Sequence, residues 1–484
     1  MTYPPNAHTA PAPGLGQPQP PGPGTMVLGT VPAQPSAAPP GMPPEGPHRP
    51  SGVWAEGRDR LRRAATTEPG RLQIIGAVLA VLVVAFGAVT AFEISDRASS
   101  ADDVVSRSQP LSADAASIYR SLADADTAAA SGFLAGAQEP ADVHKRYTDD
   151  IATASRLLVK AAANTEGSVE STREITALSE QLPRYTGLIE RARAANRQGL
   201  PLGGAYLRYA NQQMTTELLP AAERLYAAET ARLHADDEEA RALPYVSLIL
   251  GLVALAALAA AQRRNYLRTN RVLNHGLLAA TAASVVVLLW LVAGHTVARA
   301  ELNNAREHGQ SSLQVLTSAR INSLKARANE NLTLVARGAV LTDDGKNDKY
   351  ETEHTAGMEA LTIALAEARE LADDDAGRDP VAQAADRVAE WKERHAGARA
   401  TDNAGDYEGA LTRVIGAKDS TGQSFDQVDA LLKRALDHEQ TEFTRSASDG
   451  RGALTALPLG AGVLAVLGAV GAIMGINRRL SEYR

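Results

Sequence analysis

The sequence predicts an all-α membrane protein in which four transmembrane helices carry two extracytoplasmic antiparallel four-helix bundles, arranged as an internal duplication. Three observations predict this fold class. Four apolar runs are long enough to cross a bilayer, two long polar segments repeat apolar residues at helical spacing, and the order of span, polar segment and span occurs twice. The resulting segments are 1–70, 71–92, 93–243, 244–261, 262–274, 275–298, 299–453, 454–476 and 477–484.

The composition excludes several classes of protein. The chain has 484 residues, more than the roughly 250–300 that one hydrophobic core organises, so more than one structural unit is expected. It contains no cysteine, which rules out disulfides, thiolate metal sites and thiol catalysis. The 49 basic and 56 acidic residues give a net charge of −7, whereas a nucleic-acid binder would carry a net basic domain or stripe. We therefore expect no nucleic-acid partner.

Residues 1–70 are predicted to form a disordered, proline-rich cytoplasmic arm. Residues 1–50 hold 16 of the 25 prolines and 7 of the 39 glycines, and they show no apolar periodicity. Such a segment buries too little apolar surface to offset the entropy lost on ordering. A solvated spacer is the preferred interpretation, and a polyproline ligand at Pro18–Pro23 is the alternative.

The first apolar run, Leu72–Phe92, shows how the spans are assigned. It has 21 residues without a charge, and at ~1.5 Å per residue it crosses the ~30 Å hydrocarbon layer. A cleaved signal peptide is the alternative, but the preceding stretch is far longer than the charged region of a signal peptide. The other three runs are Tyr245–Ala261, Gly276–Ala298 and Leu454–Ile476.

Positive charge in the short flanks sets the expected orientation, because cytoplasmic flanks of membrane helices are enriched in Lys and Arg. The loop 262–274 has four arginines and no acidic residue, and the tail 477–484 has three arginines beside Glu482. We therefore expect a plasma-membrane protein with both termini and this loop in the cytoplasm. The polar segments then lie outside, with net charges of −6 for residues 94–243 and −8 for residues 299–453.

Each polar segment is expected to form four antiparallel helices, since an even number returns the chain to the membrane. Apolar residues recur at spacings of three and four, as at Leu178, Leu182 and Tyr185. Pro183 and Pro220 fall inside expected helices and should kink them or shift a boundary. The helix-breaking clusters that mark the turns are 136–140, 164–168, 199–204, 343–347, 373–380 and 401–405.

The two halves end in the same local pattern, which supports the duplication. A Leu-Pro pair enters the span that closes each half, and an Arg-Arg pair leaves it. The four pairs are Leu243-Pro244, Leu457-Pro458, Arg263-Arg264 and Arg478-Arg479.

No pattern in the chain supports enzymatic chemistry, a metal or a cofactor. There is no glycine-rich phosphate loop ending in Gly-Lys. His438–Glu442 begins like a zinc-protease helix, but Glu442 stands where a second histidine is required. Asp343–Asp348 is similar to a calcium loop but lacks glycine at its sixth position, so we interpret it as a turn between helices. The acidic runs Asp236–Glu239 and Asp373–Asp375 are interpreted as solvated helix ends, with a cation site as the alternative.

The spans contain almost no ionisable residues, which disfavours a channel or transporter. His295, three residues from the end of its span, is expected at the membrane interface or at the entry to a bundle. Gly471 and Gly475 form a GxxxG pair that predicts close helix packing, with chance occurrence in a span rich in Gly and Ala as the alternative.

The expected cytoplasmic parts are too small to hold a kinase, a cyclase or a receptor signalling rod. Any signal would therefore pass to another protein through the basic loop, the basic tail or the N-terminal arm. The candidate partner-contact residues are Arg263, Arg264, Arg268, Arg271, Arg478, Arg479, Tyr483 and Arg484.

Two stretches carry a resemblance to a known family. Residues 192–208 read ARAANRQGLPLGGAYLR, and the chain ends INRRLSEYR from Ile476. With the doubled layout, these stretches resemble the GlnX-type membrane sensors of actinobacteria. The resemblance implies a transducer between a GlnH-like solute-binding lipoprotein outside, which senses acidic amino acids, and a PknG-like soluble Ser/Thr kinase inside. The proline-rich arm departs from that family.

Other interpretations stay open at this point. A structural envelope scaffold without signalling is the main alternative function, and the sequence leaves open whether the chain forms a homodimer. Arg184 and Arg191 are candidates, by residue type, for clasping a carboxylate in a bundle. The turn at Asn196–Pro201 is interpreted as structural punctuation, with a partner contact at Arg197 or Tyr206 as the alternative.

Overall fold

The fold is all α-helical in a computed structural model that describes residues 66–164, 168–269 and 274–480. Within these ranges there is no β-strand, and Leu341 and Asp348 form one isolated bridge. The predicted fold class is therefore confirmed. Nearly all of the proline-rich arm, residues 1–65, lies outside the described residues, as does the end of the tail after residue 480.

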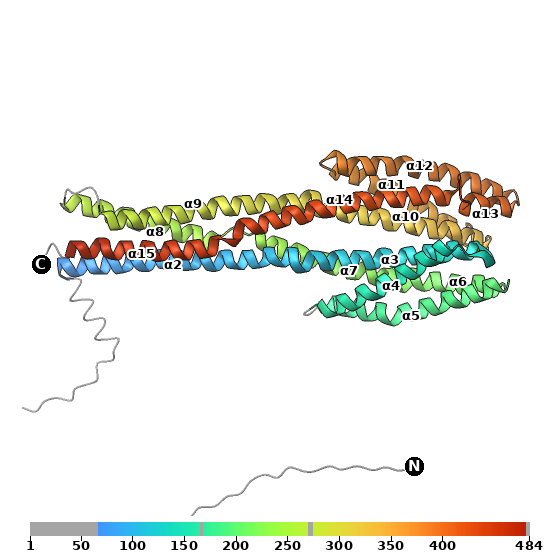
Figure 1. Cartoon of the computed structure of the whole chain (residues 1–484), viewed down its shortest axis with the longest axis horizontal. Helices are drawn as coiled ribbons and strands as arrows, with labels where there is room; N and C mark the ends of the chain where they lie inside the picture. The colour runs from blue at the N-terminus through green and yellow to red at the C-terminus, as the bar shows by residue number, and fades with distance from the viewer. Residues whose placement is uncertain (1–65, 165–167, 270–273, 481–484) are drawn as a thin grey trace, which may run out of the picture. The chain divides into compact units, whose positions relative to one another are not determined.

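The first half of the chain consists of an apolar helix, a helical bundle and a second apolar helix (Figure 1). We call α3 to α7 bundle 1. The elements are α2 Glu68–Asp103, η1 Val104–Ser108, α3 Gln109–Leu134, η2 Gly136–Gln138, α4 Ala141–Asn164, α5 Val169–Arg197, α6 Leu202–Gln213, η3 Met214–Leu218, α7 Leu219–Arg241 and α8 Tyr245–Thr269.

The second half repeats this order, and we call α10 to α14 bundle 2. The difference from the expected four helices is the nine-residue α13, which follows the predicted break near Gly405 and ends before a further turn at 416–420. The elements are α9 His275–Asn304, η4 Ala305–Gln310, α10 Ser311–Ala336, α11 Lys349–Leu371, α12 Asp375–Asn403, α13 Tyr407–Ile415, α14 Thr421–Thr455 and α15 Leu457–Leu480.

Short polar side chains cap six of the described α-helices. Each accepts a hydrogen bond from a main-chain N–H of the first turn, which would otherwise lack a partner. The calcium-like segment Asp343–Asp348 forms a turn between helices, as expected. Asp344 accepts from the main-chain N–H of Lys346, and Asp348 caps α11. The capping residues are Ser168, Asn274, Asp348, Asp374, Asp406 and Ser420.

Four helical regions, around α2, α8, α9 and α15, are long and apolar enough to cross a membrane. They gather at one end of the unit formed by residues 61–484, and the bundles occupy the other end (Figure 1). Their outward faces remain apolar and exposed, as at Val81 (67%), Phe92 (74%) and Leu459 (78%). A helix that is apolar on all sides suits lipid and not water, so this end is consistent with a membrane protein.

Two segments of π-helix, η1 and η3, precede proline residues. Pro110 follows η1 by two residues, and Pro220 follows η3 in the same way. A proline ring clashes with the carbonyl four residues earlier and cannot donate the usual hydrogen bond, and the wider π turn accommodates both defects. Pro220 therefore shifts a helix boundary, as expected, whereas Pro183 lies within the uninterrupted α5.

The chain breaks between α7 and α8 at Pro244, and α2 supplies the missing hydrogen bonds. Arg97 donates to the carbonyls of Ala242 at 2.6 Å and Leu243 at 3.1 Å. Glu93 accepts from the main-chain N–H of Ser247 at 2.8 Å. Two side chains one turn apart on α2 therefore cap both sides of the break and hold α2 against α7 and α8.

Close helix packing at the predicted GxxxG pair is confirmed. Gly471 and Gly475 on α15 lie against Gly276 at the start of α9, and the Asn274 amide donates to the Gly475 carbonyl at 2.9 Å. A methyl group at Gly276 would overlap main-chain atoms of both α15 glycines. Main chain meets main chain here, so none of the three positions has room for a larger residue.

We expect Gly276→Ala to destabilise the protein by about 1–3 kcal/mol, the usual cost of overpacking a tight contact. Gly462→Ala, on α15, is the matched control, because its added methyl group would meet nothing within 4 Å. The measurement is the thermal unfolding midpoint in detergent. Equal midpoints for the two variants would contradict the close contact.

Candidate functional site

The two bundles meet along α3 and α10, and this junction is the centre of the candidate site. Thr127 on α3 donates to the Leu324 carbonyl on α10 at 2.9 Å, and the Asn331 amide donates to Ser131 at 2.7 Å. Buried apolar residues of both bundles belong to one continuous hydrophobic cluster. The bundles are therefore halves of one core.

Charged residues tie four helices together across this junction. Arg146 on α4 lies 2.8 Å from Asp124 on α3 and 3.9 Å from Asp429 on α14. Arg320 on α10 donates twice to Asp429, at 2.6 and 3.0 Å. Such a bidentate pair fixes geometry as well as charge. Of these contacts, the one between Arg146 and Asp429 joins the two bundles, so a displacement of one bundle against the other would break it.

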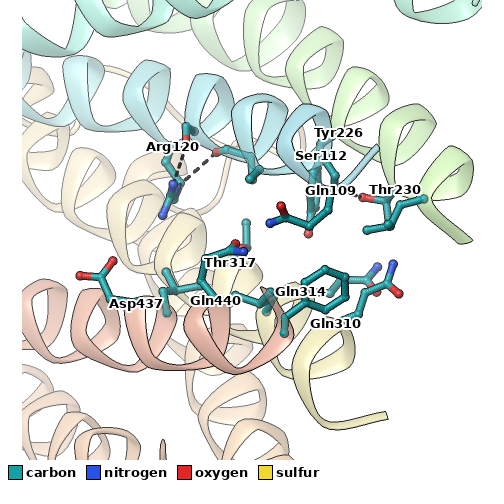
Figure 2. A pocket seen from close by; sticks show the side chains of 17 residues that line it. Gln109, Ser112, Arg120, Tyr226, Thr230, Gln310, Gln314, Thr317, Asp437 and Gln440 are labelled. Atoms are coloured by element: carbon teal, nitrogen blue, oxygen red, sulfur yellow. Dashed lines mark hydrogen bonds between the residues drawn. The ribbon is translucent and has the colours of Figure 1, made fainter. Parts of the chain in front are cut away.

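A cavity of about 240 Å³ lies between the bundles beside η1 and η4. Its walls come from α3 and α7 of bundle 1 and from η4, α10 and α14 of bundle 2, and most of the labelled side chains are polar (Figure 2). Ser112 and Thr230 hydrogen-bond to each other at 3.0 Å. The labelled residues are Gln109, Ser112, Arg120, Tyr226, Thr230, Gln310, Gln314, Thr317, Asp437 and Gln440.

Arg120 is the cationic group of this cavity. It extends from α3 toward the side of the cavity formed by Thr317 and Gln440 (Figure 2). Its guanidinium donates only within α3, to the Ala116 carbonyl at 3.3 Å and to the Ser117 hydroxyl at 2.7 Å. Among the residues described, no carboxylate lies within ion-pair distance of it. Burial and the nearby Arg320 lower the pKa of Arg120 to about 10.

A second cavity, of about 400 Å³, is lined by residues of α3, α6, η3, α7, α10 and α11. Its one fully buried acid, Asp126, accepts from the Tyr185 hydroxyl at 3.1 Å and the Asn211 amide at 2.7 Å. Burial raises the pKa of Asp126 to about 6. Lys325, in the same wall, donates to the Tyr119 hydroxyl at 3.1 Å. Among the residues described, Asp126 and Lys325 bond neutral groups, as Arg120 does.

Bundle 2 contains a buried ionic network centred on Glu330. This carboxylate accepts from Arg327, from the Trp391 indole at 3.2 Å and from His395 at 2.8 Å, and His395 in turn contacts Glu351 at 3.0 Å. Burial alone would raise the pKa of Glu330, but Arg327 and His395 outweigh it and lower the pKa to about 2. For His395, hydrogen bonds to both carboxylates outweigh burial and raise the pKa to about 9.

Two groups of side chains in the described ranges have metal-ligand donors within 4.8 Å of one another. In the first group, the Glu330 carboxylate already bonds both His395 and Arg327. The network is therefore charge-compensated and suited to a structural role. The second, Asp374, His438 and Glu442, joins the acidic run at 373–375 to the segment that begins like a zinc-protease helix. His438 there forms a hydrogen bond with Asp374 at 3.1 Å, which accounts for the cluster without a metal.

The sequence-predicted partner contacts that the structure describes lie at the end opposite the bundles. Arg263 and Arg264 are exposed on α8, and Arg478 is exposed on α15. Gln262, next to Arg263, bonds Thr281 on α9, and the start of α9 contacts Gly475, so loop and tail share one end (Figure 1). The side chains of Arg268 and Arg479, and all of Arg271, Tyr483 and Arg484, lie outside the described residues.

The arginines that the sequence suggested for a carboxylate lie elsewhere. Arg184 and Arg191 are exposed on α5, beside an open surface groove between α5 and α6. Sequence reasoning missed Arg120, although a signal existed. Gln109, Ser112 and Arg120 share one face of their helix, and Gln314 and Thr317 share one face of theirs. A stripe of polar side chains along a helix whose other faces carry small apolar residues indicates that the polar face forms an interface.

These features define a class of protein: a helical, membrane-type chain with a polar cavity between two duplicated bundles. Residues 100–238, from the end of α2 into α7, match the family described as an actinobacterial sensor domain. Bundle 1 is thus similar to such a domain, which supports an actinobacterial sensor family and a sensor role. No curated protein and no solved structure matches the chain.

The Asp124–Asp150 pair gives the junction a pH dependence. Burial and the Asp124 carboxylate raise the pKa of Asp150 from its ordinary 3.8 to about 8. The folded protein therefore holds a proton that the unfolded chain releases, and stability falls as pH rises from about 4 to about 8. We expect Asp150→Asn to raise the unfolding midpoint at pH 8.5 and to leave it unchanged at pH 4.

The control is Asp149→Asn, because Asp149 is an exposed neighbour paired with Lys145 on the same helix. Its pH profile of thermal unfolding should follow that of the unchanged protein. An identical profile for Asp150→Asn would show that Asp150 is ionised in the folded state, against expectation.

Removing the buried acid of bundle 2 should be costly. Glu330→Gln leaves Arg327 without its carboxylate partner, and breaking a buried pair costs about 3–5 kcal/mol. Asp375→Asn is the comparison. It breaks an ion pair with Arg378 that has the same spacing along the helix, and the Asp375 side chain is 90% exposed. Such exposed pairs contribute ~0–1 kcal/mol. Denaturant unfolding of both variants measures the difference, and comparable losses would refute the network's structural role.

Proposed function

We propose that this protein is a non-enzymatic transmembrane sensor or adaptor that relays an extracytoplasmic signal to a cytoplasmic regulator. The observation that carries the proposal is the continuity of helix from the apolar end into the sensor-like bundle. α2, η1 and α3 follow one another without a gap, and residues 100–238 match a sensor domain. A rigid rod that begins in the bilayer therefore ends in the wall of the cavity.

The same connection exists in the second half. α9, η4 and α10 also follow without a gap, and only Ala456 separates α14 from α15. A ligand or partner that favours one arrangement of the bundles would shift the apolar helices with it, provided that it binds two arrangements with different affinity. A difference of a few kcal/mol is sufficient for such a shift.

By resemblance, the signal is the availability of acidic amino acids, delivered by a solute-binding lipoprotein, and the receiver is a soluble Ser/Thr kinase. The basic loop and tail supply the inner contact surface in this proposal. Support comes from their position, since the loop and the tail lie at one end of the unit and the bundles at the other (Figure 1).

A structural scaffold is the second candidate, and the shared core favours it. One hydrophobic cluster runs through both bundles, so the junction is rigid enough to act as a fixed support. Cysteine crosslinking between α3 and α10 separates the two functions, because the chain has no cysteine of its own. A crosslinking rate that responds to extracellular solutes supports the sensor, and an invariant rate supports the scaffold.

The inner contact surface is tested by capture of soluble proteins on membranes that hold the full chain. We expect replacement of Arg263, Arg264, Arg478 and Arg479 by Gln to weaken capture of the regulator about tenfold, since four charge contacts of ~0.35 kcal/mol each sum to ~1.4 kcal/mol. Mass spectrometry of the captured proteins is the readout.

The matched control replaces Arg173 and Arg191, two exposed arginines of bundle 1, by Gln and should leave capture unchanged. Equal capture by both variants would remove the basic loop and tail from the proposal. Capture of no soluble protein by the unchanged chain would favour the scaffold.

A further inference from the structure

The cavity between the bundles holds a cation, Arg120, that forms no ion pair with any described residue, although Asp429 and Asp437 act to raise its pKa. Arg320, whose charge acts to lower the pKa of Arg120, is held by Asp429 in a bidentate pair, and Asp429 forms no ion pair with Arg120. Asp437 lines the cavity, but its carboxylate pairs with Lys433 at 2.7 Å. Arg120 therefore directs a cation into a polar space without a protein anion within ion-pair distance in the described part of the chain.

We propose that this cavity binds a small organic solute through a single carboxylate, with Arg120 as its counter-ion. A guanidinium presents paired N–H donors that match the two oxygens of a carboxylate. One terminal nitrogen of Arg120 donates to the Ser117 hydroxyl, and its Nε donates to the Ala116 carbonyl. The remaining N–H groups can donate to a ligand. The lowered pKa of this arginine has the same origin, because burial and Arg320 disfavour its charge until an anion arrives.

The rest of the wall limits the ligand further. Gln109 and Gln314 make no side-chain hydrogen bond to any residue described, so their amides can bind hydroxyl, carbonyl or amino groups of the solute. The volume of about 240 Å³ lies below the ~300–1,000 Å³ of drug-sized pockets, which indicates a small molecule. The cavity offers one cation without an ion-pair partner among the described residues, and the Asp437 carboxylate lines the same cavity. This charge balance disfavours the binding of a dianion such as phosphate.

This inference deepens the proposed function and rests on it for its biological meaning. Walls from both bundles surround the ligand, so its binding would change the junction that joins the two continuous rods. The binding itself can be tested without any inner partner.

The experiment measures binding of lactate, pyruvate and succinate to the full chain in lipid nanodiscs by isothermal titration calorimetry. Lactamide, the neutral counterpart of lactate, and inorganic phosphate are the comparison probes. We expect saturable binding of lactate or pyruvate, at least tenfold weaker binding of lactamide, phosphate and the dianion succinate, and at least a tenfold loss in Arg120→Gln. Arg120→Lys keeps the charge and should restore part of the affinity.

Two controls keep the result interpretable. Arg184→Gln removes an exposed arginine of bundle 1 and should bind as the unchanged chain does. Thr317→Val alters the opposite wall without touching Arg120 and should weaken binding if the cavity is the site. Unfolding midpoints establish that each variant is folded.

The inference is overturned if no monocarboxylate binds saturably, if lactamide or phosphate binds as well, or if Arg120→Gln has no effect. These failures leave the capture experiment on the basic loop and tail untouched. Conversely, carboxylate binding with invariant α3–α10 crosslinking would retain the site and reject the sensor.

Discussion

The continuity of the main-chain hydrogen bonds through the apolar end is the constraint on which the structure depends. A peptide group in lipid has no water to bond, so the chain can leave a helix only where another group replaces its partners. α2 and α9 therefore continue into the bundles. The break before α8 is tolerated because Arg97 and Glu93 on α2 bond the freed carbonyls and N–H group. This requirement fixes each bundle to the apolar helices below it.

Much of this architecture is readable from local sequence. The charge-free runs, the capping residues Ser168 and Asp374, and the breaks near Gly136 and Gly199 each depend on a few neighbouring residues, and the structure has helix ends there. The shared core of the two bundles was not foreseen. It depends on contacts such as Thr127 with Leu324, which are 197 residues apart, and helical periodicity carries no information about partners at that separation.

The candidate cavity was beyond the sequence for a related reason. Residue type alone cannot tell an arginine whose charge is compensated from one that is not. Arg184 and Arg191 had the right chemistry and proved to be on the surface, whereas Arg320 is neutralised by Asp429 and Arg120 forms no ion pair with a described residue. What distinguishes them is the neighbour supplied by another helix. The basic loop, in contrast, was identifiable because charge beside an apolar run is a local signal.

The π turns at η1 and η4 have a geometric consequence. Each holds one residue more than an α turn, and one residue corresponds to about 100° of rotation about a helix axis. The stripe of side chains that packs in the apolar end is thus out of phase with the stripe that faces the other bundle. If such a π turn moved along its helix, the two ends of the helix would rotate relative to each other about the helix axis without sliding. The two repeats carry this element at matching places, between the first apolar helix of each half and the bundle that follows it.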